Sequence, residues 1–209
     1  MKIAFIGAGN MATGLGKHWV AKGHELFFSH SRDQYKLKKQ AASVSAMAKV
    51  GTADEAAKFA DVVILATPYD ASSAAIRAAG DLKGKMLWSI VNPLKADFSG
   101  LQVGTTTSGA EELAKVAPES RFVAALPPFA EVLHANRLPD PSPSVFVYSY
   151  DEEARKTVID LVTDLGVDAV DAGPLYAARF FEPAMMGLVY LAYGQKMGCS
   201  MGLRLLNNN

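Results

Sequence analysis

The sequence predicts an α/β protein with a Rossmann-type, doubly wound and mostly parallel sheet, followed by a C-terminal helical segment. Three observations support this prediction. The apolar run Ile3–Ile6 leads directly into Gly7-Ala8-Gly9 and then into a helical pattern carried by Met11, Leu15 and Trp19. Short apolar runs then alternate with polar helical segments along most of the chain. These runs are continuously apolar, which is typical of parallel strands that helices cover on both faces.

The first half of the chain predicts five strands and the helices between them. Thr52-Ala53-Asp54-Glu55 is a capping-box pattern that begins one of these helices. The run 61–66 is continuously apolar after its first residue, as expected of a buried strand. The expected strands lie at residues 2–6, 25–28, 44–46, 61–66 and 86–91. The helices expected after the first one lie at 33–42, 52–60 and 71–79.

The second half predicts three more strands and a different C-terminal end. Ser108 begins a helix at 111–116, and acidic residues in the first turn of 151–165 suit the positive end of a helix. The strands are expected at 121–126, 145–149 and 167–170. Residues 176–206 have a helical sequence pattern and are rich in methionine and aromatic residues, which predicts a core helix or a helix at a dimer interface. We therefore expect a dinucleotide-binding domain over 1–173 and a helical segment over 174–209.

Composition excludes several classes of partner. The chain has 21 basic and 21 acidic residues, so no excess of one charge would attract nucleic acid or an anionic membrane. No apolar run approaches the length that spans a bilayer. Cys199 is the single cysteine and has no partner for an internal disulfide. These features predict a cytoplasmic protein that acts on a small molecule.

The first glycines predict a pyrophosphate site. A helix N-terminus presents free backbone N–H groups and about half a positive charge, which suit an anion. Gly7 permits the turn, Gly9 lets the phosphates approach, and Ala12 replaces the third glycine of the usual pattern while still permitting close helix–strand packing. The expected pyrophosphate-binding residues are Gly7, Gly9, Asn10, Met11 and Ala12.

The end of the second strand indicates which dinucleotide binds. NAD sites usually place an acidic residue there, whereas this chain reads Ser29-His30-Ser31-Arg32. Hydroxyls and a guanidinium suit the 2′-phosphate of NADP. The alternative is a polar turn with a solvated Arg32.

Two further strand ends are predicted to line the cofactor. Ligands of open parallel sheets bind beyond the carboxyl ends of the strands, so Thr67-Pro68-Tyr69 and Asn92-Pro93 are expected beside the glycine turn. The alternative is that both are ordinary turns, for which proline and asparagine are common. No catalytic triad, metal-ligand spacing or paired-carboxylate site stands out, and the catalytic residues stay unknown.

Several motifs together resemble one family. They are Gly7-Ala8-Gly9-Asn10-Met11, the serine-rich end of the second strand, Ala66-Thr67-Pro68-Tyr69, Val91-Asn92-Pro93-Leu94, and Asp171-Ala172-Gly173-Pro174-Leu175 with Arg179 and Glu182. The chain resembles the NADP oxidoreductases that depend on the deazaflavin coenzyme F420, together with the broader group of dinucleotide-binding reductases around them. The resemblance covers nearly the whole chain, and the last motif is its most specific part.

The resemblance implies hydride transfer between a nicotinamide and a deazaflavin or flavin held face to face. The cofactors then carry the reaction while the protein holds their rings in contact. One segment departs from the family pattern: Ala125-Leu126-Pro127-Pro128 replaces a polar A-L-H-T or K-A-F-N-T segment. Leu126, Pro127 and Pro128 are expected to face the acceptor, whose identity this departure leaves open.

The resemblance and the residues leave three functions open. The first is an NADP(H)-dependent oxidoreductase that acts on coenzyme F420 or a flavin and forms a homodimer. The second is a dehydrogenase or reductase of a small substrate, which requires a proton donor. The third is a non-catalytic NADPH-binding redox sensor.

Overall fold

An eight-stranded sheet forms the centre of the computed structural model, which describes residues 1–29 and 33–206. The strand order is β3-β2-β1-β4-β5-β6-β7-β8. The first six strands are parallel, β7 is antiparallel to β6, and β8 is parallel to β7. The predicted doubly wound sheet is therefore confirmed. The strands are β1 (Lys2–Ile6), β2 (Glu25–Ser29), β3 (Lys49–Gly51), β4 (Val62–Leu65), β5 (Met86–Ser89), β6 (Arg121–Ala125), β7 (Ser144–Tyr148) and β8 (Asp168–Asp171).

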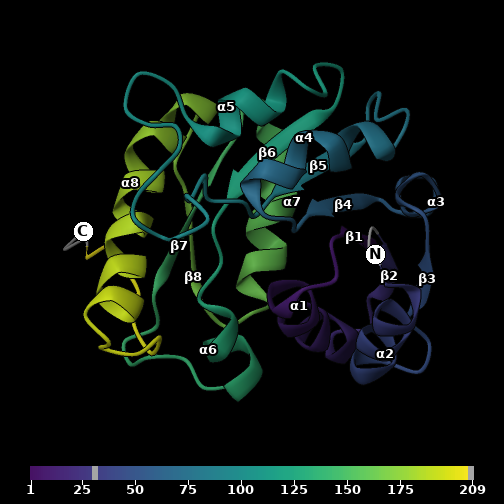
Figure 1. Cartoon of the computed structure of the whole chain (residues 1–209), viewed down its shortest axis with the longest axis horizontal. Helices are drawn as coiled ribbons and strands as arrows, with labels where there is room; N and C mark the ends of the chain where they lie inside the picture. Colours follow the sequence, from purple (N-terminus) through teal and green to yellow (C-terminus); the bar gives the residue numbers. More distant parts are fainter. Residues whose placement is uncertain (30–32, 207–209) are drawn as a thin grey trace.

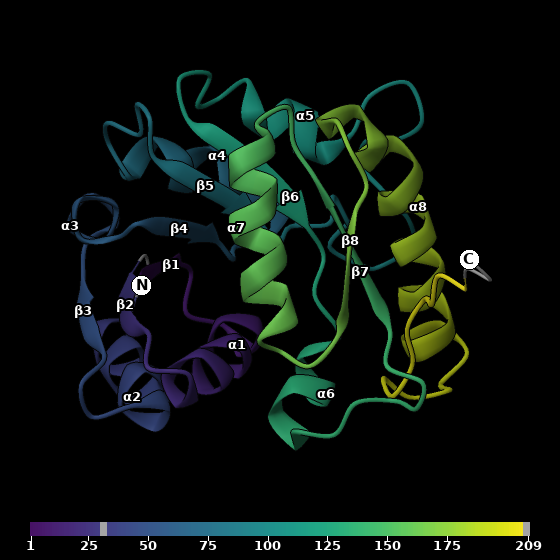
Figure 2. The same cartoon turned by 180° about the vertical axis from the view of Figure 1, so that it is seen from behind.

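Helices cover both faces of this sheet. Figure 1 shows α4 and α5 in front of the sheet, and Figure 2 shows α7 on the opposite face, with α8 at the side of the molecule in both views. The helices are α1 (Asn10–Ala21), α2 (Gln34–Val44), α3 (Ala53–Phe59), α4 (Tyr69–Ala78), α5 (Gly109–Ala114), α6 (Ala130–Ala135), α7 (Glu152–Thr163) and α8 (Ala178–Val189), with a 3-10 turn η1 (Leu175–Ala177) and a π turn η2 (Tyr190–Gly194).

Strand β1 shows why its sequence is apolar without alternation. Ile3 and Phe5 belong to a core cluster that includes Trp19 of α1, while Ala4 and Ile6 belong to the cluster on the other face. All four strand residues are completely buried. Successive side chains of a strand point to opposite faces, so a strand that is covered on both sides needs an apolar residue at every position.

The third strand differs from its prediction. Residues 44–46 were expected to form it, but α2 continues to Val44 and the strand lies at Lys49–Gly51. Asp33 caps α2 by accepting a hydrogen bond from the Lys36 backbone N–H at 2.9 Å, and the helix then extends to Val44. The predicted capping box of Thr52 and Glu55 is confirmed.

The C-terminal segment is helical only as far as Gly194. Residues beyond it were also expected to be helical, but 195–206 form an irregular segment that contacts the start of β7. The backbone carbonyl of Leu203 accepts a hydrogen bond from the Ser144 N–H at 2.7 Å. Gly198 has a φ of +85° in this segment, which a helix does not allow. The division of the chain at residue 174 stays a prediction.

None of the helices within residues 1–29 and 33–206 combines the length and the apolar character needed to cross a bilayer.

Candidate functional site

The predicted glycine turn lies between β1 and α1. Gly7 has a φ of +107°, and a Cβ atom there would overlap the backbone carbonyl of Ala66 at the end of β4. Gly9 is the N-cap residue of α1, and a Cβ atom there would meet nothing within 4 Å. The turn therefore packs closely against β4 on one side and leaves the N-terminus of α1 open on the other, as an approaching pyrophosphate requires.

A cleft of about 900 Å³ adjoins this turn, between the ends of β1 and β4. It brings together four of the predicted cofactor residues, Gly7, Gly9, Thr67 and Pro68. Lys36 and Gln40 of α2 also line it. The strand order reverses between β1 and β4, which is the point where open α/β sheets bind their ligands. We call this the dinucleotide cleft.

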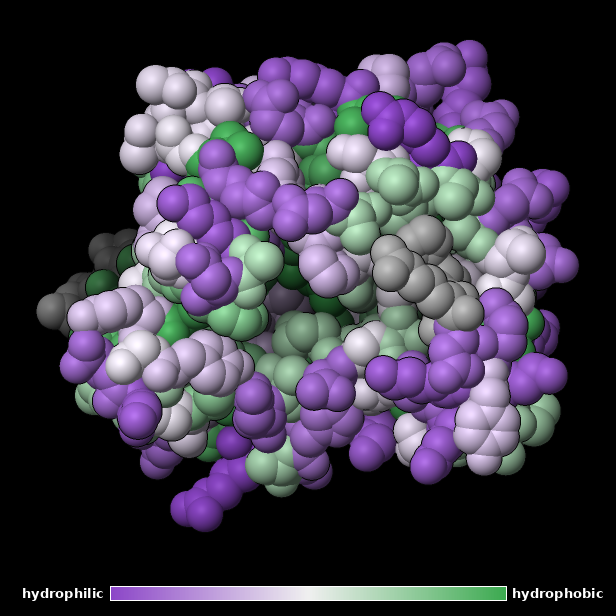
Figure 3. Space-filling view, viewed as in Figure 1, coloured by the Kyte–Doolittle hydropathy of each residue, from purple (hydrophilic) through white to green (hydrophobic). Residues whose placement is uncertain are grey.

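A second pocket, of about 330 Å³, lies on the other side of the α1 N-terminus. It brings together six more of the predicted residues, Asn10, Met11, Asn92, Leu126, Pro127 and Pro128. Other residues that line it include Phe98, Phe129, Glu131, Met185, Val189 and Tyr193. Figure 3 shows the face seen in Figure 1, which is hollowed near its middle with apolar residues inside the hollow. We call this second pocket the acceptor-side pocket.

Asn92 is a polar residue in the lining of the acceptor-side pocket. Its side-chain oxygen Oδ1 is buried and has no hydrogen-bond partner within residues 1–29 and 33–206. A buried amide oxygen without a donor is costly, so its place in the pocket suits a ligand that donates a hydrogen bond. The carboxamide of a nicotinamide and the ring N–H groups of a flavin or deazaflavin are such donors. The residues present thus fit a dinucleotide with a ring acceptor beside it.

Four predicted cofactor residues do not line either cavity. The Ser29 side chain is completely buried and its hydroxyl donates to the Phe5 carbonyl at 2.8 Å, so the expectation that it holds a 2′-phosphate is wrong. Ala12 is completely buried in the contact between α1 and the sheet, as its predicted packing role requires. Tyr69 packs against the core, and Pro93 is buried beside Gly109 of α5. His30, Ser31 and Arg32 lie outside the described residues.

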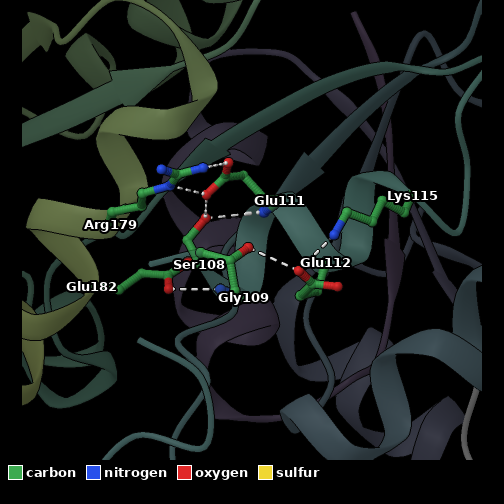
Figure 4. A network of polar contacts seen from close by, with 8 residues as sticks. Ser108, Gly109, Glu111, Glu112, Lys115, Arg179 and Glu182 are labelled. Carbon is green, nitrogen blue, oxygen red and sulfur yellow. Dashed lines mark hydrogen bonds and ion pairs between the residues drawn. The ribbon is translucent and has the colours of Figure 1, made fainter. Parts of the chain in front are cut away.

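Arg179 and Glu182 of the most specific motif connect α8 to the N-terminus of α5 (Figure 4). Glu182 is 1% exposed, and its two carboxylate oxygens accept hydrogen bonds from the backbone N–H groups of Gly109 and Ala110, each at 2.8 Å. Arg179 forms two hydrogen bonds of 2.8 and 2.7 Å to Glu111. The motif therefore fixes one helix against another.

This connection has clear electrostatic consequences. Hydrogen bonds from Arg179 hold the pKa of Glu111 below its ordinary value. Burial raises the pKa of Glu182 to about 7, although the two backbone N–H groups act in the opposite direction. With this pKa, the Glu182 carboxyl gains or loses its proton near neutral pH, although it lies in a buried contact between two helices.

The contact between α8 and α5 lies close to the acceptor-side pocket. Gly109 lies against Pro93, where an added Cβ atom would come within 2.8 Å of the proline ring. Pro93 follows Asn92, and Met185, one turn beyond Glu182, lines the same pocket. The α8–α5 contact therefore positions both the Asn92 loop and one wall of the pocket.

The matches with known proteins agree with this geometry. The model of the family described as "NADP oxidoreductase coenzyme F420-dependent" matches residues 2–93. The F420-dependent NADP reductase of Methanocaldococcus jannaschii is 33% identical over 229 aligned positions, which cover 99% of each chain. This chain belongs to the family of F420-dependent NADP oxidoreductases. The predicted family is thereby confirmed, and with it the expectation of an oxidoreductase.

Solved structures resemble this family member over its full length. A crystal structure from Arthrobacter sp. FB24, of a candidate F420-dependent NADP reductase, has a TM-score of 0.88 and 26% identity and covers 99% of this chain and all of that one. The imine reductase of Myxococcus stipitatus has a TM-score of 0.70 and 15% identity, and covers 94% of this chain and 64% of that one. At this identity the second likeness shows the shared fold alone.

The sequence analysis missed several residues that line the cavities of this family member. Lys36 and Gln40 are four residues apart in α2, and this spacing on a polar helix just after the predicted phosphate turn was a usable signal. Tyr193 and Glu131 had no such signal, because they are 62 residues apart and only the fold brings them together.

Three histidines make polar contacts with residues that are distant in the sequence. His18 and His134 contact backbone carbonyls of Leu133 and Asn10, each at 3.0 Å, and His24 lies 3.4 Å from an Asp164 carboxylate oxygen. These contacts tie α6 and α7 to the region of α1. Outside residues 30–32 and 207–209, no cluster of three or more histidine, cysteine or acidic residues is suited to a metal ion.

Proposed function

We propose that this family member transfers a hydride between NADP(H) and coenzyme F420, with a flavin as the alternative acceptor. Two cavities that meet at the N-terminus of α1 support the proposal, because one suits a dinucleotide and the other suits a ring placed at its nicotinamide end. The bound nicotinamide and acceptor supply the redox chemistry, and the protein supplies their alignment. The name of the Methanocaldococcus jannaschii relative agrees with this pairing of substrates.

Residues of the two cavities would have different roles in binding. The Gly7–Gly9 turn and the open end of α1 would bind the pyrophosphate, and Lys36 together with Arg32 and Ser31 would bind the 2′-phosphate. Asn92 would orient the carboxamide or the acceptor ring. Leu126, Pro127 and Pro128 would keep water away from the face where the rings meet, since Pro127 and Pro128 are buried apolar residues at the pocket wall.

The observation that carries the proposal is the pocket beside Asn92. Binding and turnover experiments with the purified protein test the proposed function. NADPH binding is first measured by fluorescence, and nicotinamide absorbance then follows NADPH oxidation with coenzyme F420, FMN, FAD or no acceptor. We expect fast oxidation with F420 and slower or no oxidation with the flavins. Tight NADPH binding without turnover on any of the three would contradict the proposal and favour a small-molecule substrate or a sensor.

Lys36 provides a test of the cofactor preference. A charge-assisted hydrogen bond to a phosphate contributes about 1.5–3 kcal/mol, so Lys36→Ala is expected to raise the Kd for NADPH about tenfold or more and to leave the Kd for NADH unchanged. We expect the same of Arg32→Ala. Lys38→Ala is the control, because Lys38 is exposed on α2 and does not line the cleft. An equal loss for NADPH and NADH would remove Lys36 from the phosphate site.

We further propose a cytoplasmic homodimer formed through the C-terminal helices. Tyr176, Phe180 and Tyr190 are 46%, 66% and 54% exposed, and such a group of exposed aromatic residues commonly marks a protein contact. The single cysteine agrees with a reducing compartment. Light scattering should give twice the mass of the chain, and a monomeric mass at working concentration would contradict the dimer.

A further inference from the structure

Tyr193 and Glu131 form a polar pair in the wall of the acceptor-side pocket. The Tyr193 hydroxyl donates a hydrogen bond to a Glu131 carboxylate oxygen at 3.1 Å. Both residues line the pocket that also contains Asn92. Apart from Asn10 and Asn92, the other residues that line the pocket are apolar, so this pair is a specific chemical feature of the site.

The aromatic ring of Tyr193, a side chain that is 44% exposed, has two aromatic neighbours. Its centroid lies 5.9 Å from the ring of Phe98 and 5.9 Å from that of Phe129, the latter in an edge-to-face arrangement. Tyr193 lies in the π turn η2 that follows α8, a type of turn that is frequent at functional sites. The hydroxyl is therefore directed by packing as well as by its hydrogen bond.

Two titratable groups face the Tyr193 hydroxyl. They are the Glu131 carboxylate from α6 and the Cys199 thiol from the C-terminal segment. Burial, the thiol and the carboxylate all raise the pKa of Tyr193, so the phenol keeps its proton at neutral pH. Glu131 is exposed and can therefore exchange protons with solvent.

We infer that Tyr193 donates a proton to the acceptor when it is reduced, and that Glu131 resupplies this proton from solvent. The inference rests on the proposed function, because a ring acceptor that takes up a hydride at one atom also gains a proton at a heterocyclic nitrogen. It assigns a catalytic residue to a protein whose sequence offers no evident proton donor.

Atoms and electrons balance in this step. NADPH gives the hydride, with both electrons, to the acceptor and becomes NADP⁺. The Tyr193 O–H bond breaks as its proton forms the N–H bond of the reduced acceptor. A proton from solvent then binds the Glu131 carboxylate and passes from it to the Tyr193 oxygen, so the phenol is restored and Glu131 is a carboxylate again. The sum is the consumption of NADPH, acceptor and one proton.

The test compares Tyr193→Phe, Glu131→Gln and a control, Tyr150→Phe, with the wild type. Tyr150 is an exposed tyrosine that does not line the pocket. NADPH oxidation is measured with the active acceptor from about pH 5.5 to 9, in water and in deuterium oxide, and binding of the oxidised acceptor is measured separately by fluorescence quenching.

We expect Tyr193→Phe to lower kcat about 100-fold, the lower end of what a positioned proton donor contributes, while the Kd for NADPH is unchanged. It should also weaken acceptor binding several-fold and remove the solvent isotope effect of the wild type. Glu131→Gln should lower kcat less and change the shape of the pH profile. Tyr150→Phe should behave as wild type.

The experiment distinguishes failure of the Tyr193 inference from failure of the proposed function. If the wild type turns over the acceptor and Tyr193→Phe keeps its kcat, isotope effect and acceptor affinity within about twofold, the inference is overturned and the proposed function stands. If the wild type binds NADPH and turns over no ring acceptor, the proposed function fails and the inference fails with it.

Discussion

Gly7→Ala is expected to abolish NADPH binding and to lower the free energy of unfolding by about 3 kcal/mol or more. Gly7 has a φ of +107°, which side chains rarely tolerate. The added Cβ atom would overlap the Ala66 carbonyl oxygen and lie 2.8 Å from the carbonyl carbon, and these are backbone atoms directly after β4 that cannot rotate away. Denaturant unfolding and NADPH fluorescence titration measure the two effects.

Gly9→Ala is the matched control for this prediction. A Cβ atom at Gly9 meets nothing within 4 Å of the protein, and Gly9 has an ordinary extended backbone with a φ of −78°. The variant should therefore fold as stably as the wild type, yet bind NADPH more weakly because its methyl group fills the approach to the α1 N-terminus. If Gly9→Ala binds NADPH like the wild type, the pyrophosphate does not lie on this turn.

Glu182→Ala is expected to lower the free energy of unfolding by about 3 kcal/mol, because it removes the acceptor of two backbone N–H groups at the N-terminus of α5 and leaves a buried gap. The effect should extend to catalysis, since Gly109 packs against Pro93 beside the acceptor-side pocket. We expect a raised KM for the acceptor and little change in the Kd for NADPH.

A matched variant checks the first part of this expectation. Glu112→Gln changes a carboxylate of α5 whose partners, Thr107 and Lys115, lie near the surface, and it should cost less than about 1 kcal/mol. Equal losses of stability in Glu182→Ala and Glu112→Gln would show that the buried contact between α8 and α5 has no special importance.

The Glu182 carboxyl should also make stability depend on pH. Burial raises its pKa from 4.5 to about 7 in the folded protein, so between these values the folded state holds a proton that the unfolded state has released. Rising pH then favours unfolding. The stability of the wild type relative to the neutral variant Glu182→Gln should fall by about 1.4 kcal/mol for each pH unit within this window.

Denaturant unfolding of wild type and Glu182→Gln between about pH 5 and 7.5 measures this difference. The subtraction removes the contributions of the other titrating groups. A difference that stays constant, or that grows in favour of the wild type as pH rises, would show that the carboxylate is already ionised throughout this range.

Local sequence determined most of the fold. The apolar runs predicted every strand but one, because a strand buried on both faces must be apolar throughout, and this shows in the sequence directly. The glycine turn was also predicted, since only glycine adopts the backbone of Gly7 without strain. The third strand was predicted to begin at Val44, because valine suits a strand. In the structure Val44 is instead the last residue of α2, and the strand begins at Lys49.

Only the tertiary structure decided which polar residues face the site. Ser29 follows the expected pattern for a phosphate ligand, but its hydroxyl points to the neighbouring strand β1. Arg179 and Glu182, which the sequence showed only as part of the most specific family motif, join α8 to α5, whereas Tyr193 and Glu131 come together from positions 62 residues apart. Sequence periodicity reports whether a position is buried, while the direction of a polar side chain depends on neighbours from distant segments, which exist only once the chain has folded.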